Sequence, residues 1–303
     1  MGNREKNFVS AIVYLHNDGD HVVPFFQKLN EMLNAHFEKY ELIAVNDAST
    51  DNGVEQLKRW AAVLEKPLTI LNMSLFQQCE NSMNAGQDIS IGDYVFEFDS
   101  IMDNFDFELA YHTYEKCLEG NDIVSLCPSS TKVSSKLFYW LFNHSCHSTN
   151  RIRTDVFRVV TRRAINRVHA LSDYLPYRKA AYAVSGLRIV SLDCDTVTPK
   201  SRSGRLHLAV NSLALYTSAG YKISIGITGM MLVVALLELI YAIAIYCVGK
   251  PIEGWTTTMI VLTCGFFGVF LIQTIVIKYL SLLLDMVFRK QKYLIEGIEK
   301  IQK

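Results

Sequence analysis

Two long apolar runs in the last third of the chain constrain its fold more than any other feature. The first extends from Ile223 to Val248, and Glu238 is its one residue with a charge at neutral pH. The second begins near Trp255 and continues to about Leu284, interrupted by Gln273 and Lys278. Because about 20 apolar residues suffice to cross the hydrocarbon core of a bilayer, each run predicts a transmembrane helix.

A short connector, Gly249 to Gly254, separates the two runs, so the predicted helices must be antiparallel neighbours in a hairpin. Basic residues cluster outside this hairpin: Lys200, Arg202, Arg205 and Lys222 before it, and Arg289, Lys290 and Lys292 after it. The positive-inside rule therefore places both ends in the cytoplasm. No apolar stretch of the signal-peptide type occurs at the N-terminus. These features predict a multi-pass protein of the cell membrane with a cytoplasmic N-terminal domain.

The chain before Lys200 alternates between strand-like and helix-like segments. Short β-rich apolar runs indicate strands, and apolar residues at three- and four-residue spacing indicate helices. The expected strands are 8–15, 41–46, 68–71, 94–98, 123–126, 155–160 and 188–197. The expected helices are 22–40, 51–64, 81–90, 105–118, 134–142 and 162–170. This order predicts an α/β fold with a doubly wound, mostly parallel sheet, followed by amphipathic interface helices and two transmembrane helices.

The segments group into four expected regions. Residues 1–200 form a cytoplasmic domain, 201–221 an amphipathic juxtamembrane segment, 222–287 the transmembrane hairpin and 288–303 a cytoplasmic basic tail. Glu238 is costly in hydrocarbon, which favours a helix–helix or subunit contact and hence a homo-oligomer.

Polar clusters follow three of the expected strands at their carboxyl ends. They are His16 to Asp18, Asn46 to Asp51, and Asp99 to Asp103. Open sheets of this kind bind ligands in the crevice beyond those ends. Three acidic loops should therefore converge on one crevice.

The loop Val45 to Asn52 (VNDASTDN), with Asp99 after a later strand, resembles the N-terminal part of the family 2 glycosyltransferases. Together with the two C-terminal apolar runs, Ser135 to Tyr139 (SKLFY) and Phe157 to Arg162 (FRVVTR), it is similar to the polyprenyl-phosphate, dolichol-phosphate mannose synthase-like type. That resemblance implies a GT-A-like fold and inverting sugar transfer from a nucleoside-diphosphate sugar to a polyprenyl phosphate at the cytoplasmic membrane face.

The same resemblance implies roles for individual residues. The nucleotide would be held by Asn17, Asp18, Asp47 and Asp51. Asp99 and Asp103 would be catalytic and would hold Mg²⁺ or Mn²⁺, which neutralises the leaving diphosphate. Ser135, Arg158, Arg162 and Arg202 would contact the acceptor phosphate, since guanidinium groups suit phosphate oxygens. The expected partners are a nucleotide sugar, with UDP preferred to GDP, polyprenyl phosphate and the membrane, and no nucleic acid is expected.

Several positions depart from the family pattern. Ile101 stands where the second Asp of the D-x-D motif would be, and Asp103 lies where the family often has Gln. Ala48 replaces a Gly, and Pro128 to Thr131 lacks paired arginines. These departures keep open a rival interpretation, a catalytically degraded homologue that acts as a non-catalytic membrane partner in glycan assembly.

Some residues also have plainer interpretations. Asn46 to Asp51 could start the following helix as an N-cap, and Arg205 and Lys222 could be ordinary flanking charge. A processive synthase is disfavoured because two spans cannot build a translocation channel and the Q-x-x-R-W signature is absent. The seven cysteines lack a C-x-x-C pair, which favours buried thiols over a zinc site.

Overall fold

The computed structural model describes residues 4–64, 66–129, 150–171, 177–194 and 293–301, together with isolated positions within 136–175 and 226–283. The chain divides into two units. The first comprises Met1–Ala209 and Gln291–Lys303, and the second comprises Val210–Lys290.

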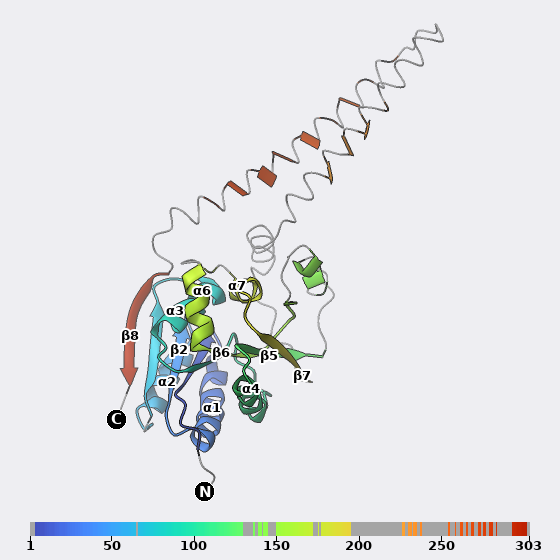
Figure 1. Cartoon of the computed structure of the whole chain (residues 1–303). Helices are drawn as coiled ribbons and strands as arrows, with labels where there is room; N and C mark the ends of the chain where they lie inside the picture. Colours follow the sequence, from blue (N-terminus) through green and yellow to red (C-terminus); the bar gives the residue numbers. More distant parts are fainter. Residues whose placement is uncertain are drawn as a thin grey trace. The chain divides into compact units, whose positions relative to one another are not determined.

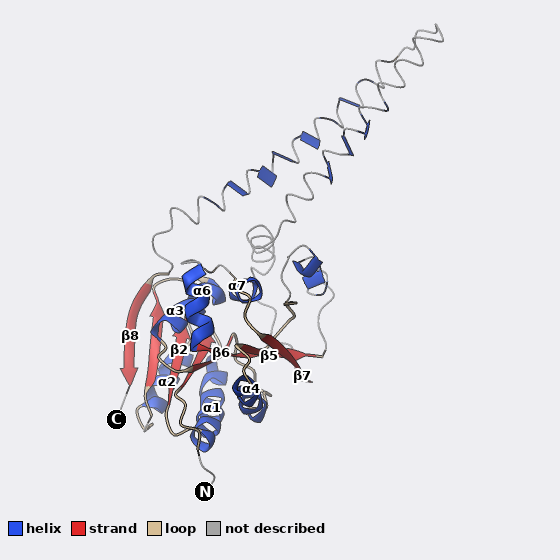
Figure 2. Cartoon of the chain, viewed as in Figure 1, coloured by secondary structure: helices blue, strands red, loops and turns tan. Residues whose placement is uncertain are grey.

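An eight-stranded mixed sheet runs through the first unit (Figures 1 and 2). Its strands are β1 (Val9–Leu15), β2 (Tyr40–Asn46), β3 (Leu68–Met73), β4 (Tyr94–Phe98), β5 (Ile123–Pro128), β6 (Phe157–Thr161), β7 (Ile189–Cys194) and β8 (Ile295–Ile301). They lie in the order β7-β5-β6-β4-β1-β2-β3-β8. Strand β6 is antiparallel to both β4 and β5, and β8 is antiparallel to β3, whereas the other pairings are parallel. The predicted α/β fold is confirmed, with a mixed sheet in which β6 and β8 are antiparallel to their neighbours.

Helices cover the sheet on both faces. They are α1 (Val22–His36), α2 (Gly53–Ala61), α3 (Gln78–Ile89), α4 (Glu108–Leu118), α6 (Arg162–Leu171) and α7 (Arg178–Val184), and a short 3₁₀ turn, η1 (Gly19–His21), precedes α1. Alternate residues of β1 face opposite ways because strand side chains alternate. Val9, Ala11 and Val13 join the core beneath α1 and α4, where Phe25 packs edge-on against Phe98 at 5.3 Å between ring centres.

Helix α3 lies on the opposite face, close to β1 and β2. A Cβ atom at Gly86 would lie 2.7 Å from Cγ2 of Ile12 and 2.8 Å from Cγ2 of Val45. Those distances are shorter than any real carbon contact, so α3 can approach the sheet this closely only because residue 86 has no side chain. The start of α3 is thereby held near the carboxyl ends of β1 and β2.

Strand β8 was not expected in the predicted tail 288–303. Its sequence, Ile295 to Ile301, alternates apolar and charged residues, and its side chains are exposed or half-buried throughout. It pairs with β3, so the chain returns to the sheet after the second unit. The sequence did not predict this edge strand because it is weakly hydrophobic and contains a glycine, and because its partner β3 lies far earlier in the chain.

The second unit is described at scattered helical positions. Among the described residues, we find no helix with the length and apolar character needed to cross a membrane. Most of the predicted hairpin 222–287, and the whole of the predicted segment 201–221, lie outside the described residues. Within this unit Gly268 lies against Met231, since a Cβ atom on the glycine would come within 2.7 Å of the methionine Cε.

Candidate active site

The loops after β1 and β2 interlock at the carboxyl edge of the sheet. The amide N–H of Thr50 donates to Asn17 Oδ1 at 2.8 Å, and the amide N–H of Gly19 donates to Asp51 Oδ2 at 2.7 Å. The loop after β4 joins them, because Asp103 pairs with His21 Nδ1 at 2.7 Å. The predicted convergence of three acidic loops is confirmed.

Three non-glycine residues at this edge have a left-handed backbone conformation. They are Asn17 after β1 (φ 55°), Ala48 after β2 (φ 52°) and Gln78 after β3 (φ 69°). Such conformations cost free energy and persist where the surrounding contacts impose them, often at binding sites. Ala48 explains why a glycine suits this position in the family pattern, since glycine adopts positive φ without a steric penalty.

Asp47 holds the loops together from beneath. It is fully buried, and its carboxylate accepts hydrogen bonds from the Tyr14 hydroxyl at 2.7 Å and from the Gln77 amide N–H at 2.7 Å. The Gln77 side chain in turn donates to the carbonyl of Leu294 at 2.7 Å and accepts from its N–H at 3.0 Å. The structure therefore places Asp47 as a support for the loop rather than on its surface.

The other predicted nucleotide residues lie around this support. Asn17 is exposed, and Asp18 accepts from the amide N–H of His16 at 2.9 Å. Asp51 also accepts from the N–H of Gly53, the first residue of α2, at 3.2 Å. The N-cap of α2 is Asn52, which makes no side-chain capping hydrogen bond, so Asp51 is not the predicted N-cap; it ties the start of α2 to the loop after β1.

An exposed aromatic pair at the same edge was missed in the sequence. The rings of His16 and Phe76 lie 4.5 Å apart, and half of the Phe76 side chain is exposed. A nucleotide base can stack on such a surface. Phe76 follows β3, and because the segment after β3 contains no acidic residue, the sequence did not predict that it joins the crevice.

Asp99, at the end of β4, lies between two arginines. Arg178 Nη2 donates to Asp99 Oδ1 at 2.7 Å, and Arg158 Nη2 donates to Asp99 Oδ2. Both arginine side chains are buried, and about a quarter of the Asp99 side chain, 26%, stays exposed. Arg178 also reaches Glu80 at 3.0 Å and Glu97 at 2.9 Å, so one guanidinium holds three carboxylates from α3 and β4.

These contacts fix the ionisation of the cluster. Burial alone would raise the pKa of Asp99, but the neighbouring guanidinium groups of Arg158 and Arg178 hold that pKa well below its usual range. For Glu97, burial dominates and raises the pKa, although the same two arginines oppose the shift. Asp99 therefore remains ionised near neutral pH, whereas the raised pKa of Glu97 makes it easier to protonate than an ordinary glutamate.

The described residues do not fit the divalent-cation site that the resemblance implies. Both oxygens of Asp99 accept from arginine, Ile101 has no ligand atom, and Asp103 has its own partner in His21. Within the part of the chain that the structure describes, His, Cys, Asp and Glu side chains form no group of three suited to a metal ion. The predicted pairing of Asp99 with Asp103 is therefore not seen.

The two predicted phosphate-binding residues that the structure describes lie at opposite edges of the sheet. Arg158 is buried in the Asp99 cluster. Arg162 donates to the carbonyl of Gly92 at 3.0 Å and to the Ser90 hydroxyl at 2.9 Å, and both partners precede β4. Arg162 thus lies at the amino edge of the parallel strands, opposite to Asp99. Ser135 and Arg202 lie outside the described residues.

Three members of the Asp99 cluster were missed in the sequence: Glu80, Glu97 and Arg178. Glu97 carried a usable signal, because it interrupts the apolar strand Tyr94–Phe98 and a charge in a buried strand needs a partner. Arg178 lies in a short helix without a clear apolar period. Its position beneath Asp99 depends on tertiary packing.

Comparison with known proteins shows what the N-terminal half of the chain is similar to. Residues 10–157 match the model of "Glycosyl transferase family 2". These residues, just under half of the chain, are therefore similar to the family 2 glycosyltransferases. The match ends within β6, so it includes the three loops and Asp99 but leaves out α7 and Arg178.

Two curated relatives are named as glycosyltransferases. The uncharacterized glycosyltransferase YkcC of Bacillus subtilis is 24% identical over 96% of this chain and 94% of its own length. The uncharacterized glycosyltransferase sll0501 of Synechocystis is 26% identical over 59% of this chain. That match spans 58% of the cyanobacterial protein.

Solved structures support the fold. The mannosyltransferase PcManGT of Pyrobaculum calidifontis, in complex with GDP-Man and Mn²⁺, aligns with a TM-score of 0.51 and 13% identity over 95% of this chain and 89% of its own. Glucosyl-3-phosphoglycerate synthase of Mycobacterium tuberculosis, with phosphoglyceric acid, also gives 0.51, at 11% identity over 70% of this chain and 80% of its own. The sheet is accordingly an α/β, GT-A-like mixed sheet.

Proposed function

We propose that the chain transfers a sugar from a nucleoside-diphosphate sugar to a polyprenyl phosphate at the cytoplasmic face of a membrane. The observation that carries this proposal is the interlocked carboxyl edge within the residues that match the family 2 model. There, the strained loops after β1, β2 and β3 meet the partly exposed, ionised Asp99. Asn17, Asp18 and Phe76 line the donor side of this edge, with Asp47 and Asp51 as supports.

The reaction does not require the protein to transfer a proton efficiently. An oxygen of the acceptor phosphate attacks the anomeric carbon, the bond from that carbon to the diphosphate breaks, and the nucleoside diphosphate leaves with the bonding electron pair. Because a phosphate is already anionic near neutral pH, a strong general base is not required. The protein must position the two substrates and stabilise the negative charge that develops on the diphosphate.

A divalent cation remains part of the proposal only through similarity. The Pyrobaculum mannosyltransferase is in complex with Mn²⁺ as well as GDP-Man. In this chain the arginines already occupy both oxygens of Asp99, so we assign no step to a metal. Activity measured with Mg²⁺, with Mn²⁺ and after chelation therefore tests whether the chain needs a divalent cation.

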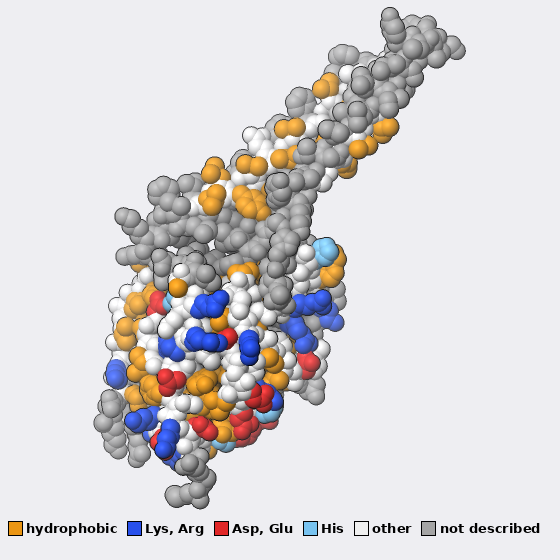
Figure 3. All heavy atoms as spheres, in the orientation of Figure 1, with side chains coloured by type: hydrophobic (Ala, Val, Ile, Leu, Met, Phe, Trp, Pro, Cys, Tyr) orange, Lys and Arg blue, Asp and Glu red, His pale blue; other side chains and the backbone are white. Residues whose placement is uncertain are grey.

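The membrane location rests on the second unit. Its described positions include apolar side chains that are about half exposed, among them Leu262, Val269, Val276 and Leu283. Figure 3 shows exposed hydrophobic side chains along the described part of this unit. Large exposed apolar surfaces are rare on soluble proteins, whereas lipid tails cover them at no cost. We infer that 222–287 forms a membrane hairpin and that the sheet domain faces the cytoplasm, as the flanking basic residues predict.

One observation favours the rival function. Arg158 and Arg178 both pair with Asp99, and Ile101 stands in place of a second carboxylate. These features would also suit a domain that has lost catalysis and serves as a membrane partner in glycan assembly. Such a domain would still bind nucleotide through the loops after β1 and β2.

The deciding experiment is sugar transfer by the purified full chain in detergent. A panel of UDP- and GDP-sugars is offered with undecaprenyl phosphate, with Mg²⁺, Mn²⁺ or a chelator, beside Asp99→Asn and the control Glu31→Gln on the exposed face of α1. A lipid-linked sugar that forms with wild type and Glu31→Gln, but not with a folded Asp99→Asn, supports the enzyme. Nucleotide binding without any product from the whole panel would favour the non-catalytic partner.

A further inference from the structure

A hollow beside the Asp99 cluster has no role in the donor site. It lies between α7 and the strands β5, β6 and β7, and its enclosed volume is about 30 Å³, or about 380 Å³ when the open space at its mouth is included. Four basic residues line it, together with the single acid Asp155: Arg151, Arg153, Arg158 and Lys179. The other lining residues are the hydroxyl and thiol groups of two serines and a cysteine, and the apolar residues Ile123, Ile152, Ile189 and Tyr182.

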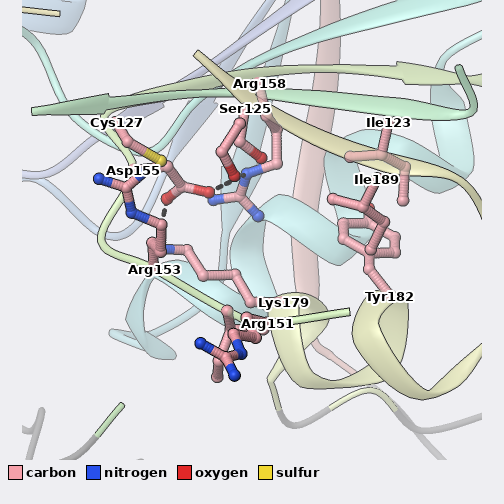
Figure 4. A pocket seen from close by; sticks show the side chains of 12 residues that line it. Ile123, Ser125, Cys127, Arg151, Arg153, Asp155, Arg158, Lys179, Tyr182 and Ile189 are labelled. Atoms are coloured by element: carbon pink, nitrogen blue, oxygen red, sulfur yellow. Dashed lines mark ion pairs between the residues drawn. The ribbon is translucent and has the colours of Figure 1, made fainter. Parts of the chain in front are cut away.

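The lining is divided in two (Figure 4). The basic side chains and Asp155 gather on one side, and Ile123, Ile189 and Tyr182 lie on the other. A fully polar ligand would leave the apolar side unused, and a hydrocarbon would leave the arginines unused. The lining therefore matches a ligand with an anionic head and an apolar substituent.

Buried donors on the floor of the hollow lack acceptors. Arg158 is 1% exposed, and its Nε and Nη1 atoms have no hydrogen-bond partner among the described residues. The nearest carboxylate oxygens, of Asp155 and Glu97, lie at 3.4 and 3.3 Å, in ion pairs too poorly aligned to be hydrogen bonds. Leaving a buried donor unsatisfied is costly, and guanidinium donors fit phosphate oxygens well.

Further basic side chains lie at the rim of the hollow, and the residues at its bottom do not neutralise them. Asp155 is shared between Lys179 and Arg158. Arg153 pairs with Asp193 at 2.7 Å, but both side chains are about half exposed or more, so an anion can displace that pair at little cost. Arg151 is exposed at the mouth. An incoming anion thus meets exposed, solvated cations first and buried ones afterwards.

From this arrangement we propose that the hollow binds the phosphate monoester of the acceptor, with Arg151 and Arg153 drawing it in and Arg158 and Lys179 receiving it. This inference rests on the proposed sugar transfer and replaces Arg162 in that role. Its location fits, because Arg158 contacts both Asp155 in the hollow and Asp99 at the crevice. A phosphate held there would lie one side chain away from the proposed reaction centre.

Two sources could supply such a group, a prenyl phosphate from the bilayer or a soluble phosphate ester. The test is calorimetric binding by the full chain in detergent to geranyl phosphate, geraniol, glycerol 3-phosphate and inorganic phosphate. Wild type is compared with Arg151→Ala/Arg153→Ala and with Arg59→Ala, which removes an exposed charge from α2. Both rim residues are exposed, so the double variant should keep the wild-type melting temperature.

We expect geranyl phosphate to bind wild type and Arg59→Ala alike, and the double variant to bind at least about tenfold more weakly, since two charge-assisted contacts are lost. Geraniol should bind none of them measurably. Asp193→Asn, which frees Arg153, should bind geranyl phosphate more tightly than wild type. Preference for glycerol 3-phosphate over geranyl phosphate would keep the site but assign it to a soluble acceptor.

Equal affinity of wild type and the double variant, or no binding of any phosphate, would overturn the proposal. Kinetics separate this failure from failure of the transfer reaction. If transfer occurs, the double variant should raise the KM for the lipid phosphate at least about tenfold while kcat and the KM for the nucleotide sugar change little. Arginine-dependent binding without transfer would leave the site standing and remove the proposed reaction.

Discussion

The two sides of the crevice hold their carboxylates by different means. On the donor side, at the ends of β1, β2 and β3, Asp47 and Asp51 accept hydrogen bonds from neutral donors, namely a tyrosine hydroxyl and backbone N–H groups. On the acceptor side, around β6 and α7, Glu80, Glu97 and Asp99 are held by buried guanidinium groups. The donor side depends on loop geometry and the acceptor side on charge balance.

This difference predicts that substitutions on the two sides of the crevice change stability by different amounts. A neutral hydrogen bond contributes about 1 kcal/mol, and its loss stays local. Removing one member of a buried ionic network leaves the others uncompensated and costs several times more. Substitutions on the acceptor side should therefore affect the stability of the whole domain, whereas those on the donor side should act mainly on loop order and nucleotide affinity.

The largest effect is expected for Arg178→Met. It leaves three carboxylates around a site that keeps only Arg158, so the free energy of unfolding should fall by about 3–5 kcal/mol. Chemical denaturation of the full chain, followed by tryptophan fluorescence, measures it. Arg59→Ala should stay within about 0.5 kcal/mol of wild type. A loss below about 1 kcal/mol for Arg178→Met would show that the two sides do not differ in this way.

An intermediate effect is expected for Tyr14→Phe on the donor side. The buried Asp47 carboxylate loses its hydroxyl donor, which should lower the free energy of unfolding by about 1–3 kcal/mol and weaken nucleotide binding. Tyr40→Phe is the matched control, because its hydroxyl donates to Asn30 at 2.7 Å away from the crevice. Equal nucleotide affinity in both variants would separate Asp47 from the donor site.

A gain in stability is expected for Ala48→Gly. Because Ala48 has φ of 52°, glycine relieves the strain, and the free energy of unfolding should rise by about 0.5–1 kcal/mol. Ala35→Gly, at an exposed position of α1, should lower it by up to about 1 kcal/mol. Opposite signs for the two changes in thermal melts support the loop geometry, and a loss at both positions contradicts it.

The smallest effect concerns the edge strand β8. Glu299 accepts from Lys58, which lowers the pKa of the carboxyl group below its ordinary value, 4.5, when the chain is folded. Its contribution to stability is therefore present above that value and lost as the pH falls below it. Glu299→Gln should lower stability by less than about 1 kcal/mol at pH 7 and by nothing near pH 3. A difference that persists at pH 3 would point to a packing effect.

The sheet could be predicted from the sequence because its first seven strands are short, apolar and separated by helical periods. The observed ends of some helices and strands differ from the predicted ends where tertiary contacts determine them. The helix expected to reach Tyr40 ends at His36, because Tyr40 starts β2 and buries its ring there. Strand β8 escaped prediction because its pairing with β3 joins distant segments and its pattern is half polar.

The site was predicted best where it depends on position along a strand. Asn17, Asp18 and Asp51 lie where the loops were expected to meet, and Asp99 lies at the end of β4. The charge partners of Asp99 could not be predicted, since Arg178 lies far from Glu80 in the sequence and meets it only through folding. Local pattern also could not show that Arg162 points to the opposite edge.

The order of the strands has a consequence for how the protein is made. The outermost strands are β7 at one edge and β8 at the other, and the second unit, 210–290, lies between them in the sequence. During synthesis, seven strands can assemble while β3 still presents an unpaired edge. The sheet is completed only after the whole inserted unit has left the ribosome. If that unit enters a bilayer, closure of the sheet, and with it the Gln77 contact to Leu294 above Asp47, must wait for insertion.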